Sequence, residues 1–208
     1  MHAPLKRYSL DVIQEIISLH PEIKSVQLIL HDVALNWRQK YGTHESITSH
    51  FEEALDQEVP LKIKHYLRND FLQLQPEDLI AGEHQVWSFT SKVTMADDTF
   101  RHIPMMNFHP LQEATLEDII GFIELSEPST KGAILSSGRY FHYYGYTLLS
   151  EDEWLQFNAR FLMPVILVSP RYIGHRLRDG YSTLRLTSDT TFKPKVPELI
   201  DKSYIFYQ

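Results

Sequence analysis

The amino-acid sequence predicts an α+β fold, in which a mixed, largely antiparallel sheet from residue 85 onward carries helices on one face and joins a helical N-terminal part. Two observations predict this class. After residue 85, apolar runs of strand length alternate with amphipathic helical stretches, and turn signals separate them. The chain has 208 residues, 43% hydrophobic and 12% aromatic, which is enough for one domain with a sizeable core. We therefore expect residues 1–84 to form an N-terminal α/β part of the same domain as residues 85–208.

The first part is predicted to combine three helices with one short strand. Apolar residues at helical spacing predict a helix over 9–17, with Ser9 as its N-cap. Residues 26–30 form an apolar run of strand length. Helical spacing returns over 43–55 and again over 61–74.

The second part begins with a predicted hairpin. Residues 85–94 alternate as a strand does, Asp97-Asp98 signals a turn, and residues 100–108 form the return strand. Residues two apart in a strand point the same way, so Asn107 and His109 at its end are expected to share a face.

The remaining elements are predicted by capping signals and apolar runs. Capping-box patterns at 115–118 and 150–153 each open an amphipathic helix. The runs that predict strands are residues 132–137, 139–149, 165–168 and 181–187. Residues 193–197 are expected to leave the domain as an extended segment.

Charge is unevenly placed along the chain. The formal net charge of −7 argues against a general nucleic-acid binder. Residues 1–130 carry 10 Lys and Arg against 20 Asp and Glu, whereas residues 131–208 carry 10 against 7. Six arginines lie from Arg139 to Arg185. Basic charge therefore gathers in the last third of the chain, although solvated helix faces also produce such an asymmetry.

Composition excludes several kinds of site. The chain has no cysteine, so disulfides, thiolate metal sites and a cysteine nucleophile are ruled out. No stretch has the unbroken apolar length of a membrane span, and no long apolar core follows Lys6 and Arg7. We expect a soluble, cytoplasmic protein that does not bind membranes.

Two segments combine small residues, arginines and a histidine. They are Ser-Ser-Gly-Arg-Tyr-Phe-His over 136–142 and Ser-Pro-Arg-Tyr-Ile-Gly-His-Arg over 169–176. A guanidinium supplies a planar fork of donors and an imidazole one directed hydrogen bond, a combination suited to phosphate oxygens. A packed histidine with a satisfied ring is an equally good interpretation of either histidine taken alone.

The order of these pieces, over roughly residues 85–197, resembles the catalytic core of the archaeo-eukaryotic primase superfamily, and within it the bacterial primase 1D-like proteins. The resemblance implies an RNA-recognition-motif-like sheet joined to an N-terminal α/β unit. It also implies a role in DNA replication, in which strands are made or extended from nucleoside triphosphates with Mg²⁺ or Mn²⁺. By position, nucleotide contacts would fall to Ser137, Arg139, His142, Arg171, His175 and Arg185.

Three positions depart from the family pattern. Asn107 and His109 stand at the end of the strand where the family carries metal-binding acids, and Ser169 stands where it carries the third acid. Asparagine holds Mg²⁺ poorly compared with a carboxylate, and two-metal phosphoryl transfer needs negative ligands. His109 is left as the one candidate metal ligand. We expect the nucleotide pocket to be retained, the metal to bind weakly or not at all, and nucleotidyl transfer to be weak or lost.

Two other functions compete with a nucleotide- or nucleic-acid-binding protein. His142 and His175 are a candidate acid–base pair for metal-independent phosphodiester cleavage. The acidic first 130 residues and the missing acids instead favour a non-catalytic subunit that binds a protein partner.

Overall fold

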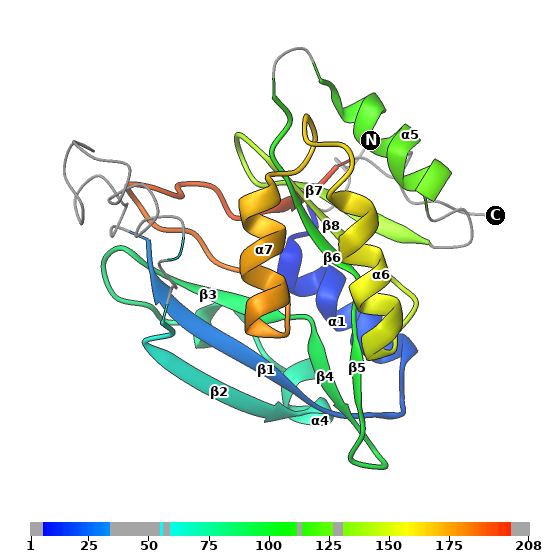
Figure 1. Ribbon diagram of the computed structural model, residues 1–208. Helices are drawn as coiled ribbons and strands as arrows, with labels where there is room; N and C mark the ends of the chain where they lie inside the picture. The colour runs from blue at the N-terminus through cyan, green and yellow to red at the C-terminus, as the bar shows by residue number, and fades with distance from the viewer. Residues whose placement is uncertain (1–5, 34–54, 56–58, 112–113, 127–130, 201–208) are drawn as a thin grey trace, which may run out of the picture.

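The computed structural model describes residues 6–33, 55, 59–111, 114–126 and 131–200 (Figure 1). Within these residues the strands form two antiparallel sheets, and helices flank them. The fold is α+β, as the sequence predicts. The helix predicted over 43–55 lies outside the described residues except at its last position. No helix in the described ranges is long and apolar enough to cross a membrane.

The first sheet is organised around its longest strand, β1. One edge of β1 pairs with β2, and its other edge pairs with both β3 and β4. The sheet has the order β5-β4-β1-β3-β9, with β2 on the free side of β1. Its strands are β1 (Ile23–Asp32), β2 (Lys62–Leu67), β3 (Gln85–Thr90), β4 (Lys92–Met95), β5 (Phe100–His102) and β9 (Thr183–Arg185).

The second sheet has the order β10-β7-β8-β6. Its strands are β6 (Met105–Phe108), β7 (Gly132–Ser136), β8 (Phe141–Gly145) and β10 (Glu198–Leu199). The predicted single return strand over 100–108 is wrong, because the chain leaves the first sheet after His102 and enters the second at Met105. Pro104 lies between them and has no amide to continue a ladder.

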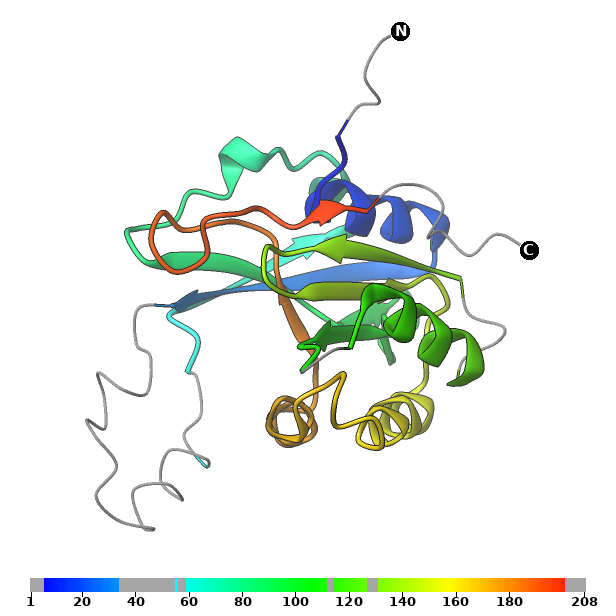
Figure 2. The ribbon, with the colours of Figure 1, turned by 90° about the horizontal axis from the view of Figure 1, so that it is seen from above.

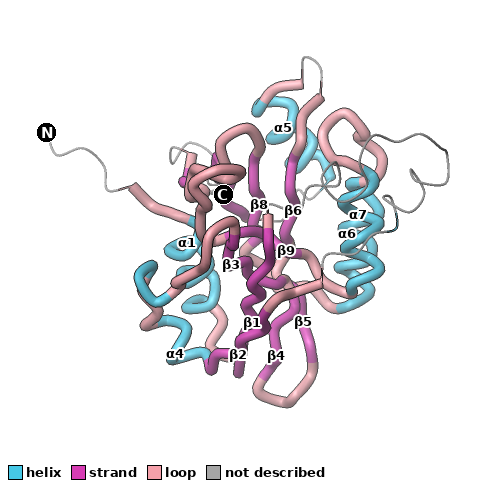
Figure 3. Tube along the Cα trace, turned by 90° about the vertical axis from the view of Figure 1, so that its left-hand side faces the viewer, coloured by secondary structure: helices cyan, strands magenta, loops and turns pink. Residues whose placement is uncertain are grey.

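Helices cover both sides of the sheets. Figures 2 and 3 show α1 on one side and the α6–α7 pair on the other. The three long helices of the second part, α5, α6 and α7, pack with the second sheet in one hydrophobic cluster. The helices are α1 (Ser9–Leu19), α4 (Arg68–Leu72), α5 (Leu116–Ser126), α6 (Glu151–Phe161) and α7 (Pro170–Asp179), with a 3-10 turn η1 (Pro76–Asp78).

The capping predictions are partly confirmed. Thr115 and Ser150 form the expected boxes with Asp118 and Glu153, at 2.7–3.3 Å. Ser9, however, is the first helical residue of α1 rather than its N-cap, which is Tyr8. Its hydroxyl donates instead to the carbonyl of Leu186, at 3.1 Å.

Two further elements differ from expectation. The helix predicted over 61–74 is a strand, β2, followed by the short helix α4, because β2 completes the free edge of β1. The strand predicted over 165–168 is a turn, since the amides of Leu167 and Val168 both bond to the carbonyl of Pro164. Two of its four apolar side chains are consequently exposed.

A buried histidine ties β5 to α6. His102 is fully buried, and its ring stacks on Trp154 with 4.5 Å between centroids. Its Nδ1 lies 3.1 Å from the hydroxyl of Ser91, and its Nε2 lies 3.0 Å from a carboxylate oxygen of Glu151. Burial lowers the pKa of His102, although Glu151 opposes this. The network joins β5 of the first sheet to α6, which packs with the second sheet.

Candidate functional site

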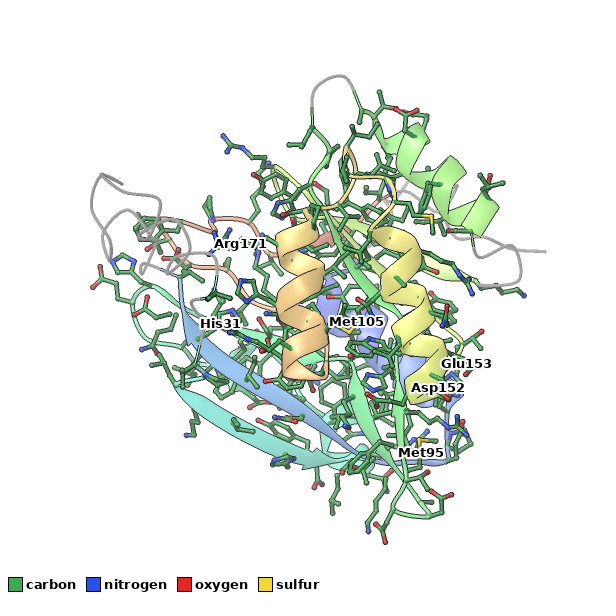
Figure 4. All side chains as sticks on the ribbon, in the orientation of Figure 1. His31, Met95, Met105, Asp152, Glu153 and Arg171 are labelled. Atoms are coloured by element: carbon green, nitrogen blue, oxygen red, sulfur yellow. The ribbon has the colours of Figure 1, made fainter. Side chains whose placement is uncertain are left out.

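One cleft of about 990 Å³ opens where the two sheets meet the start of α7. This volume is at the upper end of ordinary ligand pockets. In Figure 4, Arg171 of α7 and His31 of β1 lie on the same side of α7. All nine candidate residues named from the sequence line the cleft: Asn107, His109, Ser137, Arg139, His142, Ser169, Arg171, His175 and Arg185. The structure thus brings them together, while their roles stay predictions.

Two neighbouring strands of the second sheet supply a polar pair. Asn107 on β6 and His142 on β8 are directly opposed in the ladder. Asn107 Oδ1 and His142 Nδ1 are buried and have no hydrogen-bond partner among the described residues. Burial, reinforced by Arg185, holds the pKa of His142 well below its usual range, so the imidazole is neutral near pH 7. The pair offers hydrogen bonds without charge.

His109 follows Asn107 on the same face of the cleft. Its ring stacks on Tyr140 with 3.8 Å between centroids and 10° between planes. Burial, with a contribution from Lys193, lowers the pKa of His109 to about 4. His109 is therefore also neutral, and its position is fixed by stacking.

The turn between β7 and β8 presents an arginine. Both the amide and the hydroxyl of Ser137 donate to the carbonyl of Tyr140, at 2.8 and 3.0 Å. Gly138 has φ 107°, which a side chain would strain. Arg139 stands at the exposed tip. The hydroxyl of Ser137 thus shapes the turn, and Arg139 is the residue the turn offers to the cleft.

Helix α7 contributes the second motif. Ser169 is its N-cap and Pro170 begins it, a position where the missing amide costs nothing. Arg171 and His175 lie one helical turn apart, and Arg171 Nε is 3.4 Å from His175 Nε2. Burial and then Arg171 lower the pKa of His175, with smaller contributions from the other arginines of α7. The segment 169–176 therefore forms the cationic first turns of a helix. It is not a loop that follows a strand.

Arg185 holds two rims of the cleft together. It is 9% exposed, and its guanidinium donates to the carbonyls of Ser137, Thr187 and Lys195. Burial lowers the pKa of Arg185 to about 10, so it stays charged. Its charge reaches the cleft, but three of its donors already bind the backbone.

Several lining residues were missed by sequence reasoning. His31 and Asp32 come from the end of β1, and Lys193 and Lys195 come from the segment before β10. Asp189 supports that segment, since its buried carboxylate accepts the amides of residues 191, 192 and 193 at 2.6–3.0 Å. Burial alone would raise the pKa of Asp189, but these bonds lower it to about 2. The signal that could have found it is an aspartate followed by threonines, a common turn pattern.

The lining is strongly cationic in a chain of negative net charge. The described lining has one carboxylate, that of Asp32. Against it stand six cations: Arg139, Arg171, Arg176, Arg185, Lys193 and Lys195. Arg176 is partly neutralised by Asp179, at 3.0 Å. A cleft with this balance attracts anions.

The same lining does not fit a pair of divalent cations. Asn107, His109 and Ser169 together supply an amide, a neutral imidazole and a hydroxyl. Over the described ranges, no group of three or more His, Asp or Glu is placed to hold a metal ion. Mg²⁺ prefers carboxylate oxygens and gives up its water reluctantly, so these residues offer it little.

Comparison with known proteins finds a match at the level of the family. Residues 66–198 match the model of the archaeo-eukaryotic primase 1D-like family. The matched region contains all nine candidate residues. No curated protein and no solved structure matches the chain.

Proposed function

The chain belongs to the archaeo-eukaryotic primase 1D-like family, and from this premise we propose that its cleft binds the phosphates of nucleotides or nucleic-acid strands. Membership of the family supports a nucleic-acid-related function. The observation that carries the finer proposal is the cationic cleft, where six Lys and Arg meet one carboxylate. Guanidinium forks match phosphate oxygens in geometry as well as in charge.

We propose further that nucleotidyl transfer in this cleft is weak or lost. Two-metal transfer requires negative ligands that hold two cations about 4 Å apart. Asn107, His109 and Ser169 line the cleft without contributing a carboxylate. His109 keeps a neutral ring, but one imidazole does not assemble a Mg²⁺ site. The supported activity is therefore binding.

The test measures binding of a fluorescent ATP analogue and of a labelled single-stranded oligonucleotide by anisotropy. Arg139→Ala and Arg171→Ala should each weaken binding about tenfold, the worth of one charge-assisted hydrogen bond. Arg101→Ala is the matched control, because Arg101 is exposed on β5 and lies outside the cleft lining. Unchanged affinity in both cleft variants would remove the phosphate assignment.

Metal-independent phosphodiester cleavage is a second candidate, favoured by one observation. His142 and His175 line the same cleft, and both have pKa values below the usual range. Cleavage of single-stranded RNA in chelator, lost in His142→Ala and in His175→Ala, would support it. Absence of cleavage from pH 5 to 8 would end it. The third function considered from the sequence, a non-catalytic subunit that binds a protein partner, also stays a prediction.

A further inference from the structure

We infer that the cleft takes phosphate groups free of metal ions, and that Mg²⁺ weakens this binding instead of supporting it. The inference rests on the proposed function and specifies the chemical form of its ligand. It follows from what stands at positions 107 and 169 and from the charges around them.

At these positions the neutral imidazole of His142 and the start of α7 can donate hydrogen bonds to an anion, whereas the unpartnered Oδ1 of Asn107 accepts and needs a donor from the ligand. Asn107 faces His142 across the ladder, and together they carry two buried polar atoms without described partners. His142 is 4% exposed, and its neutral ring can donate a hydrogen bond to a phosphate oxygen. Ser169 is the N-cap of the ten-residue helix α7, whose first amides and dipole favour negative charge. Its hydroxyl makes no capping hydrogen bond to that helix.

Arg185 and Lys193 line the same cleft as the polar pair. Lys193 lowers the pKa of both His109 and His142, and Arg185 lowers that of His142 as well. Positive potential from two segments therefore reaches the polar pair. No carboxylate contributes to the shift of either histidine. The charges that a bound divalent ion would supply are thus built into the chain.

A phosphate ligand that carries Mg²⁺ is disfavoured in this cationic cleft. Mg²⁺ occupies the phosphate oxygens that the arginine forks would bind, and it cancels part of the negative charge that attracts them. It also brings two positive charges among fixed cations, which repel it at short range. Uncomplexed polyphosphate and the phosphodiester backbone of a strand avoid both costs.

The first experiment measures ATP affinity by isothermal titration calorimetry in excess EDTA and in excess Mg²⁺, at matched ionic strength. We expect binding to be about tenfold tighter in EDTA, the worth of one charge-assisted hydrogen bond. Inorganic tripolyphosphate should show the same preference. Equal or tighter binding with Mg²⁺ would overturn the inference and leave the proposed function standing. If neither ATP nor an oligonucleotide binds in either buffer, both fall.

The second experiment introduces carboxylates at positions 107 and 169. Asn107→Asp with Ser169→Asp should weaken ATP binding in EDTA about tenfold or more, because a carboxylate repels the phosphate. Mg²⁺ should then improve binding, reversing the sign of its effect. The neutral pair Asn107→Ser with Ser169→Ala controls for loss of the native side chains: its ATP affinity should fall in both buffers, while binding stays tighter in EDTA than in Mg²⁺. Circular dichroism checks that each variant is folded. Wild-type affinity of a folded acid variant in EDTA would contradict the inference.

Discussion

Asn107 on β6 and His142 on β8 face each other directly across the ladder, and each buries a polar atom with no partner among the described residues. An unsatisfied buried group of this kind costs roughly 1–3 kcal/mol. Such a cost is removed when a ligand supplies the missing partner. The relationship links the stability of the free protein to what the cleft binds.

Asn107→Leu tests that link. Removing the unsatisfied amide should leave the free protein equally stable or stabilise it by about 1 kcal/mol, while ATP affinity falls. Urea denaturation and calorimetry measure the two quantities on the same sample. Gln156→Leu, at an exposed site of α6 away from the cleft, should change neither. A variant that loses stability and keeps its affinity would show that Asn107 serves the fold alone.

Arg185 should be needed for both stability and binding. Arg185→Gln removes charge-assisted bonds to the carbonyls of Ser137, Thr187 and Lys195, and we expect a loss of about 2–3 kcal/mol in the free energy of unfolding. Arg185→Lys should not restore it, because an ammonium lacks the planar fork. Urea denaturation gives the value, with Arg101→Gln as the exposed control. Full rescue by lysine would mean that charge, and not the fork, is what matters.

Asp189 is expected to hold Lys193 in place. Asp189→Ala removes the acceptor for three consecutive amides, so hydrogen exchange at residues 191–193 should accelerate while exchange in α1 does not change. ATP affinity should fall because Lys193 loses its fixed position. Since the pKa of Asp189 is lowered from 3.8 to about 2, its stabilisation is complete above about pH 4 and is lost as pH falls toward 2. Exchange that stays slow in the variant would contradict this.

Buried histidines should lower the stability of the protein in mild acid, at pH values above those at which Asp189 is protonated. Burial lowers the pKa of His102, His109 and His142, and His109 reaches about 4. Below pH 6.5 the unfolded chain therefore binds more protons than the folded one, so stability falls from pH 6.5 toward 4. His109→Phe keeps the stacking on Tyr140 and should flatten part of this slope, as urea midpoints from pH 4 to 8 would show. An unchanged slope would mean that His109 titrates normally.

The nine residues named from the sequence line one cleft, whereas several elements around that cleft differ from the prediction. The segments 136–142 and 169–176 are local features: a turn after a strand, and a cationic segment with a histidine. Such local patterns depend little on pairing with distant parts of the chain. Nothing in the sequence near His31 and Asp32 indicates that β1 ends at the same cleft, because that depends on pairing with strands more than fifty residues away. Apolar run length likewise misled over 165–168, where Pro164 turns the chain.

Tertiary pairing also explains the other differences. The segment 61–74 has apolar residues that fit a helix, yet the open edge of β1 draws its first half into the sheet. Pro104 divides what alternation alone presents as one strand. In each case a partner distant in sequence, or a proline, outweighed the local pattern.

The central position of β1 in the first sheet determines where the protein can be truncated. The family match starts at residue 66, whereas β1 spans Ile23–Asp32 and keeps β2, β3 and β4 in register. A fragment trimmed to the matched region would expose the edges that β1 occupies, and bare edges pair between molecules. Similarity alone therefore draws the boundary of this domain too late, and a fragment that begins there should aggregate.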